Sequence, residues 1–294
     1  MSNQKISIIA IVKNEGEYIA EWIEYHKIIG FNHFYIYDDN STDNINEILK
    51  PYVSSGIATY DIAVKDGDLY TQMQTYQLAV DTYGLSNDYM IGLDIDEFIV
   101  LRKHCNIQEF LHNLRQHTDF SQLLIPWMLF GTSGHKTKPN GLVIENFLYR
   151  NRFGANGTKP IFVPIKLTGP LYYPHFIQNI AGNTVDEHGN IIDVPKYKYG
   201  DTNDKFIANH RTGRNLVYSN DLIAINHYRL KSLQEFKDKA KAQSENHPTH
   251  KNFRQKKENI QKYLDENDKN EVLDTCLLPF VEQIKHNIAQ RSKQ

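Results

Sequence analysis

The sequence predicts an α/β protein in which a mostly parallel sheet is flanked by helices. Apolar runs rich in β-branched residues alternate with segments whose apolar residues recur at helical spacing. Such alternation favours parallel strands joined by right-handed crossovers. Several of the apolar runs end directly in acidic residues, and ligands of parallel sheets collect at the carboxyl ends of strands. With 294 residues, the chain can bury one large core.

The first half of the chain shows this alternation most regularly. Ile6–Val12 is a continuous apolar run, typical of a strand buried on both faces. Between Glu15 and Ile29 the apolar residues share one helical face, and Gly30 predicts the end of this helix. We expect further strands at residues 33–37, 57–63 and 89–93, a helix through 48–49 that Pro51 closes, and a helix over 69–83.

The second half is less regular. We expect strands at Leu123–Phe130 and Leu222–Tyr228. Residues 151–220 mix short apolar runs with Gly, Asn, Pro and Tyr, which predicts irregular structure and long loops. From Ser232 onward the sequence predicts charged helices, ending in an amphipathic segment at Val272–Ile288 whose apolar face packs on the rest of the protein.

Composition and charge exclude several classes of protein. The formal net charge of −2 gives no basis for binding nucleic acid or an anionic membrane. The two cysteines, Cys105 and Cys276, lie far apart without metal-ligand spacing, which indicates a reducing compartment. No apolar run is long enough to cross a bilayer. We therefore expect a cytoplasmic protein, with peripheral association at the inner face of the membrane left open.

The most informative motif is Asp94-Ile95-Asp96-Glu97, directly after the apolar residues 89–93. Side chains alternate along an extended backbone, so we expect Asp94 and Asp96 to point the same way. Two such carboxylates form a hard-oxygen site for a divalent cation, which can bridge the phosphates of a nucleoside diphosphate. A solvated acidic turn is the alternative. The metal site is favoured because these acids interrupt an apolar sequence.

Two further polar segments follow the first and second predicted strands. Asp38 and Asp39 open the sequence DDNSTD, and either carboxylate can accept hydrogen bonds from a base or ribose. The rest of that segment can equally cap the next helix. Lys13-Asn14-Glu15 closes the first strand at the same edge, where Asn14 is either a ligand contact or a helix cap.

The segment Asn226–Ser232 combines groups suited to a metal and to a diphosphate. His227 ends a predicted strand and offers an imidazole ligand, which suits manganese better than calcium. Arg229 and Lys231 can hold the diphosphate. Ser232 and Glu235 predict a capping box at the start of a helix. A structural histidine remains the alternative for His227.

Taken together in this order, these segments resemble the glycosyltransferases of the family 2 and family 92 type. The resemblance rests on residues 13–15, 21–26, Gly30, 35–43, 94–98, 130–135, 226–228 and 231–232. It implies a GT-A (Rossmann-like) fold, a nucleotide-sugar donor, and Mn²⁺ or Mg²⁺ held by the acids of the D-x-D motif. It also implies an inverting displacement, in which a carboxylate deprotonates the acceptor hydroxyl.

The resemblance does not extend to that catalytic base. The Glu-Asp pair of many family 2 enzymes has no clear counterpart, so Glu145 is our first choice and Asp186 the second. We expect residues 1–231 to form the GT-A domain and 232–294 a helical extension. Within that domain, residues 1–120 would bind the nucleotide sugar and 121–231 the acceptor.

The predicted function is metal-dependent transfer of a sugar from a nucleotide sugar, expected to be UDP-linked, in surface polysaccharide synthesis. The acceptor would be a glycan or a lipid-linked glycan. Asp94, Asp96 and His227 would hold the metal, while Asp94 and the polar segments described above would bind the donor. Two alternatives stay open: a metal-dependent nucleotidyltransferase or nucleotide-sugar hydrolase, and a non-catalytic nucleotide- or glycan-binding protein.

Overall fold

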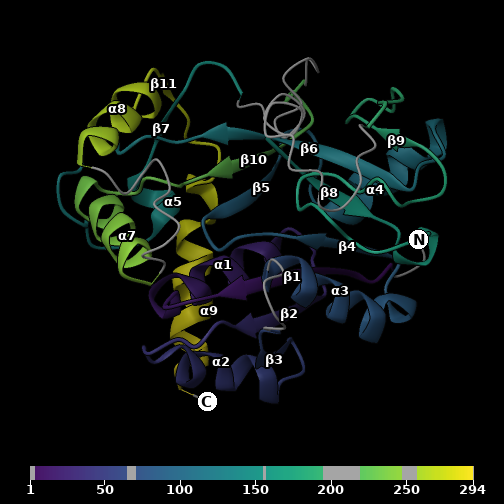
Figure 1. Ribbon diagram of the computed structural model, residues 1–294, viewed down its shortest axis with the longest axis horizontal. Coiled ribbons are helices and arrows are strands. Elements are labelled where there is room, and N and C mark those ends of the chain that lie inside the picture. Colours follow the sequence, from purple (N-terminus) through teal and green to yellow (C-terminus); the bar gives the residue numbers. More distant parts are fainter. Residues whose placement is uncertain (1–3, 65–70, 155–156, 195–218, 247–256, 294) are drawn as a thin grey trace.

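The structure is a computed structural model that describes residues 4–64, 71–154, 157–194, 219–246 and 257–293 (Figure 1). Its first half contains β1 (Ile6–Val12), α1 (Gly16–Ile28), β2 (His33–Asp38), α2 (Ile45–Ser54), β3 (Ala58–Ile62), α3 (Thr71–Tyr83), β4 (Tyr89–Gly92), β5 (Glu97–Leu101), α4 (Ile107–His117) and β6 (Gln122–Leu129). Its second half contains α5 (Val143–Asn146), β7 (Tyr149–Arg150), β8 (Thr158–Phe162), β9 (Thr184–Val185), β10 (Ile223–His227), α7 (Leu233–Asn246), α8 (Lys257–Asn267), β11 (Val272–Leu273) and α9 (Val281–Arg291).

A nine-stranded sheet dominates the described residues. Its strand order is β3-β2-β1-β4-β8-β6-β10-β5, and β9 pairs with β6. The strands from β3 to β4 are parallel, β8 is antiparallel to both its neighbours, and β6 and β10 are parallel. The predicted α/β class, with a mostly parallel sheet flanked by helices, is confirmed. The sheet brings the carboxyl ends of β1, β2, β4, β6 and β10 to one edge.

Helices cover both faces of the sheet, as the continuous apolar strands predicted. In β1, Ile6, Ile8 and Ala10 belong to one hydrophobic cluster together with residues of α1, α2, α4 and α9. Ile9 belongs to a second cluster on the other face, which contains Met73 and Tyr76 of α3. This alternation follows from the two-residue repeat of a strand.

Three predicted elements differ from the observed ones. Helix α2 does not end at Pro51 but continues to Ser54, because the burial of Tyr52 holds its last turn against the core. Strand β8 lies at the centre of the sheet, although residues 151–220 were expected to be irregular. The amphipathic segment expected at Val272–Ile288 divides into β11, a short 3₁₀ turn and α9.

The C-terminal segment is tied to the main sheet. Leu277, Val281 and Ile284 join the large hydrophobic cluster, which confirms the expected apolar packing, whereas Leu273 is exposed. In Figure 1, α9 runs alongside α1, with which it is in contact.

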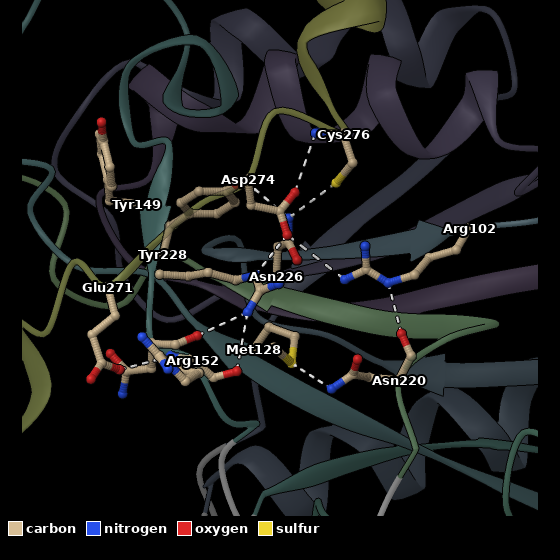
Figure 2. Close-up of polar contacts among 12 residues, drawn as sticks. Arg102, Met128, Tyr149, Arg152, Asn220, Asn226, Tyr228, Glu271, Asp274 and Cys276 are labelled. Atoms are coloured by element: carbon tan, nitrogen blue, oxygen red, sulfur yellow. Dashed lines mark hydrogen bonds and ion pairs between the residues drawn. The ribbon is translucent and has the colours of Figure 1, made fainter.

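A polar network also anchors this segment (Figure 2). The buried Asp274 carboxylate accepts a hydrogen bond from Arg150 Nε at 2.7 Å, and Arg102 lies 3.8 Å away. Asn226 contacts the sulfur of Cys276 in the same network. Asn226 therefore serves this network on one face of β10, while its neighbour His227 points to the opposite face.

Candidate active site

The acidic motif lies in a turn at the carboxyl edge of the sheet. The backbone N–H of Glu97 donates to the carbonyl of Asp94 at 3.0 Å, so residues 94–97 are not extended. The chain leaves β4 here and enters β5, although β8, β6 and β10 lie between these two strands in the sheet. The turn therefore passes across the ends of these three strands. The expectation of an extended strand through Asp94 and Asp96 was wrong, because these residues lie in a turn.

Asp94 is held by a buried lysine from β8. Lys159 Nζ lies 3.0 Å from Asp94 Oδ2 and 3.2 Å from Glu97 Oε2, and the lysine side chain is only 1% exposed. Gln72 of α3 donates to the other Asp94 oxygen. The Asp94 side chain is still 39% exposed, so it can meet a ligand. Burial raises the pKa of Glu97 to about 8, although Lys159 beside it favours the charged form.

Asp96 faces β10 and α7 instead. Its Oδ1 lies 3.4 Å from His227 Nε2, and its Oδ2 lies 3.2 Å from Lys239 Nζ. Burial alone would raise the pKa of Asp96, but Lys239 and His227 hold that pKa well below its usual range. Asp96 is thus a buried carboxylate that stays charged because cationic groups surround it.

These residues fit a divalent cation in part. The Asp96 carboxylate and the His227 imidazole face each other, and His227 Nδ1 is buried with no hydrogen-bond partner in the described part of the chain. Asp94, Asp96 and His227 do not, however, form a group with all ligand atoms within 4.8 Å. The one such group among the described residues is Glu187, His188 and Asp221. Asp96 and His227 can therefore supply two ligands, and a phosphate and water can supply others.

The loops after β1 and β2 are joined to each other. Asn14, which has a φ of 56°, accepts a hydrogen bond from the Thr42 N–H through its side-chain oxygen at 2.7 Å. It does not cap α1. That role falls to Asp43, whose Oδ2 accepts from the Gly16 N–H at 2.8 Å. Lys13 Nζ lies 3.7 Å from Asp39 Oδ2.

Asp38 and Asp39 have different surroundings. Both Asp38 oxygens accept hydrogen bonds within the protein, from the Ser41 N–H at 2.8 Å and the Tyr60 hydroxyl at 2.7 Å. Asp38 is buried and stabilises the conformation of the loop through these hydrogen bonds. Asp39 is more exposed and lies next to Lys13. Of the two aspartates predicted to contact the nucleotide sugar, the geometry favours Asp39.

Arg229 and Lys231 have partners away from the D-x-D turn. The Lys231 ammonium lies 3.3 Å from the centre of the Tyr18 ring and 3.7 Å from Glu15 Oε2. The Arg229 guanidinium stacks 5.2 Å from the Tyr263 ring. The lysine that reaches Asp96 is Lys239. The predicted capping box is confirmed, because the Ser232 N–H donates to Glu235 and the Glu235 N–H donates to Ser232 Oγ.

The two predicted bases lie in different places. Asp186 follows β9, which pairs with Gln122 and Leu123 at the start of β6, so it lies at the opposite edge of the sheet from His227. Its carboxylate accepts from the backbone of His188 and Asn190 and shapes a turn. This position makes Asp186 the weaker of the two choices, and its role as the base stays a prediction.

Glu145 belongs to α5 and contacts the C-terminal helix. It forms an ion pair with Lys285 at 2.7 Å and accepts a hydrogen bond from the Leu142 N–H. The hydrogen bond from Lys285 lowers the pKa of Glu145, so this carboxylate becomes a better base only after the pair opens. Its catalytic role stays a prediction.

Sequence reasoning missed Lys159 and Lys239. Lys159 stands two residues before the short apolar run that begins at Ile161, and this closeness to an apolar run was the available signal. Lys239 is one of several lysines in a charged helix, so only the tertiary structure distinguishes it.

A cavity of about 600 Å³ between α1, α2 and α9 is separate from the candidate active site, since its lining includes neither Asp96 nor His227.

Residues 6–155 match the family model described as glycosyltransferase family 92. The chain belongs to glycosyltransferase family 92. It is 25% identical over 200 residues to a family 92 protein of Ricinus communis, covering 66% of this chain and 35% of that protein. It is 27% identical over 147 residues to a family 92 protein of Oryza sativa subsp. japonica, covering 49% of this chain and 24% of the relative. The chain thus spans about a third or less of the length of these relatives.

Solved structures show a weaker likeness. Staphylococcus aureus TarS, in complex with UDP-GlcNAc, has a TM-score of 0.37 and 16% identity, covering 55% of this chain and 46% of the TarS chain. Glucosyl-3-phosphoglycerate synthase from Mycobacterium tuberculosis, with Mn²⁺, UDP and product, has a TM-score of 0.34 and 14% identity, covering 72% and 77%. These TM-scores are too low for either structure to define this fold.

None of the described helices is long and apolar enough to cross a membrane.

Proposed function

We propose that this chain transfers a sugar from a nucleotide sugar, UDP-linked in the first instance, to an acceptor hydroxyl with the help of a divalent cation. The observation that carries the proposal is the pairing of Asp96 with His227 at the carboxyl edge, next to the half-exposed Asp94. Membership of glycosyltransferase family 92 supports the same activity. Loops at this edge of a parallel sheet are where nucleotides bind.

In this proposal Asp96 and His227 hold Mn²⁺ or Mg²⁺, and Asp94 contributes from the adjoining turn. Such a cation would neutralise charge on the departing diphosphate. The joined loops around Lys13–Glu15 and Asp39 bind the nucleoside. Lys231 supports them through Glu15, 3.7 Å away, and Arg229 lies two residues before Lys231 in the same segment.

The transfer itself is proposed to be a single in-line displacement with inversion. The acceptor oxygen attacks the anomeric carbon as the bond from that carbon to the diphosphate breaks. The hydroxyl proton passes to a carboxylate, for which Glu145 remains our prediction. Residues 121–231, of which 155–156 and 195–218 lie outside the described part of the chain, supply the acceptor side, since specificity commonly lies on loops carried by a rigid sheet. The acceptor is proposed to be a glycan or lipid-linked glycan in surface polysaccharide synthesis at the inner face of the membrane.

Calorimetric titration with UDP tests the donor site. We expect wild-type protein to bind UDP with Mn²⁺ present and to lose most of that binding in EDTA. Asp94→Ala/Asp96→Ala should lose it in both conditions. Asp119→Ala is the control, because that carboxylate is 91% exposed and lies just before β6, at the opposite edge. If UDP binds equally well with Mn²⁺ and with EDTA, the proposed role of the metal is wrong. If no nucleotide binds in either condition, the proposed donor site is wrong.

Product analysis then separates transfer from hydrolysis. A transferase consumes UDP-sugar only when an acceptor is present, and it forms a glycosidic product. Release of free sugar from the donor alone, at the same rate with and without acceptor, would instead support the nucleotide-sugar hydrolase.

A further inference from the structure

Lys239 holds an unusual position for a residue on an exposed helix face. Its ammonium lies 3.2 Å from Asp96 Oδ2 and 3.9 Å from Glu15 Oε1. Helix α7, which carries it, begins directly after Ser232 and packs on α8 through Phe236 and Tyr263 (Figure 1). The helix therefore brings a cation from the C-terminal part of the chain to the carboxylate that faces His227.

The charge of Lys239 compensates the buried charge of Asp96. Asp96 is buried, and a buried carboxylate is costly without a compensating positive charge. Lys239 supplies that charge directly, at hydrogen-bond distance. The same position is unfavourable once a divalent cation binds between Asp96 and His227, because the two positive charges would then lie a few ångströms apart.

Among the described lysines Lys159, Lys231 and Lys239, Lys239 is the one whose side chain can change position. Lys159 is 1% exposed and fixed between two carboxylates, and Lys231 is buried against the Tyr18 ring. The Lys239 side chain is 46% exposed, and its long stem allows the ammonium to swing away from Asp96 at little cost.

We propose that Lys239 is an exchangeable counter-ion for Asp96. It neutralises the carboxylate while no metal is bound, leaves it when the cation binds, and then contacts the phosphate oxygens of the nucleoside diphosphate. The diphosphate brings negative charge to the same metal, so it is the natural new partner for the displaced ammonium. This inference rests on the proposed function and assigns to Lys239 part of the diphosphate contact that the sequence assigned to Arg229 and Lys231.

The exchange predicts opposite effects on two ligands. Lys239→Met removes a competitor for Asp96, so Mn²⁺ alone should bind roughly 2- to 5-fold more tightly, as expected for a half-exposed ion pair. It also removes a phosphate contact, so UDP in saturating Mn²⁺ should bind about 10-fold more weakly. Lys239→Arg should restore most of the UDP affinity. Lys237→Met, two positions earlier on the exposed face of α7, is the matched control and should change neither affinity.

Mn²⁺ binding is measured by calorimetry and by the electron paramagnetic resonance signal of the free ion, and neither readout depends on activity. Thermal unfolding confirms that each variant is folded. If Lys239→Met weakens Mn²⁺ binding or leaves it unchanged, the exchange is wrong, and weakening of both ligands would indicate a purely structural lysine. If wild type binds Mn²⁺ no better than Asp96→Asn, the metal site of the proposed function fails, and the exchange fails with it.

Discussion

Replacement of Lys159 by methionine tests how the candidate site is held together. Methionine has a similar length but no charge, so the change removes a buried ammonium that lies 3.0 Å from Asp94 and 3.2 Å from Glu97. At these distances each attraction is on the order of 5 kcal/mol with an effective dielectric constant of about 20, before the cost of desolvation is subtracted. Breaking a buried pair by removing one partner typically costs about 3–5 kcal/mol.

The expected loss lies at the lower end of that range. With Lys159 in place, burial still raises the pKa of Glu97 to about 8, so at pH 9 this carboxyl group is mostly charged in the wild type and can take up a proton when its counter-ion is gone. We therefore expect Lys159→Met to lower the free energy of unfolding by about 3 kcal/mol. Urea unfolding at pH 9, followed by tryptophan fluorescence and circular dichroism, measures this value.

A second substitution identifies the cause. In Lys159→Met/Glu97→Gln no buried carboxylate remains at position 97, so the loss should shrink to about 1 kcal/mol, a coupling of roughly 2 kcal/mol. Lys166→Met, at an exposed position after β8, should stay within about 0.5 kcal/mol of wild type. If the double variant is as unstable as Lys159→Met alone, the charge of Glu97 is not what Lys159 compensates, and the reasoning is refuted.

Two further predictions concern the surrounding framework. Burial lowers the pKa of His26 from 6.5 to about 3, so the folded state resists protonation while the unfolded state accepts it, and stability is lost as the pH falls below 6.5. The free energy of unfolding should drop by about 2 kcal/mol between pH 7.5 and pH 5 through this group, and His26→Gln should flatten the slope in urea titrations at each pH. Asp43→Ala removes the acceptor of the Gly16 N–H and should cost about 1–2 kcal/mol in thermal unfolding, with weaker UDP binding, whereas an unchanged melting temperature would show that Asp43 does not fasten the two loops.

The sequence by itself determined the α/β class and indicated the end of the sheet at which the proposed site lies. Hydrophobic periodicity is a local property, so the strands Ile6–Val12 and Ile223–His227 and the helix after Gly16 could be read from nearby residues. Acidic residues placed directly after apolar strands pointed to Asp94 and Asp96 for the same reason. The capping box at Ser232 was equally visible, because all of its atoms belong to neighbouring residues.

Only the tertiary structure decided which charges meet at that edge. Strand β8 enters the sheet between β4 and β6 and carries Lys159 to Asp94, which lies 65 residues away along the chain. Lys239 reaches Asp96 across 143 residues, while the pairing of β9 with the start of β6 takes Asp186 to the opposite edge. Strand order and direction depend on long-range pairing and on how both faces of the sheet are covered. A local sequence pattern does not predict those long-range contacts. The pattern therefore identified the acidic residues but not the lysines that pair with them.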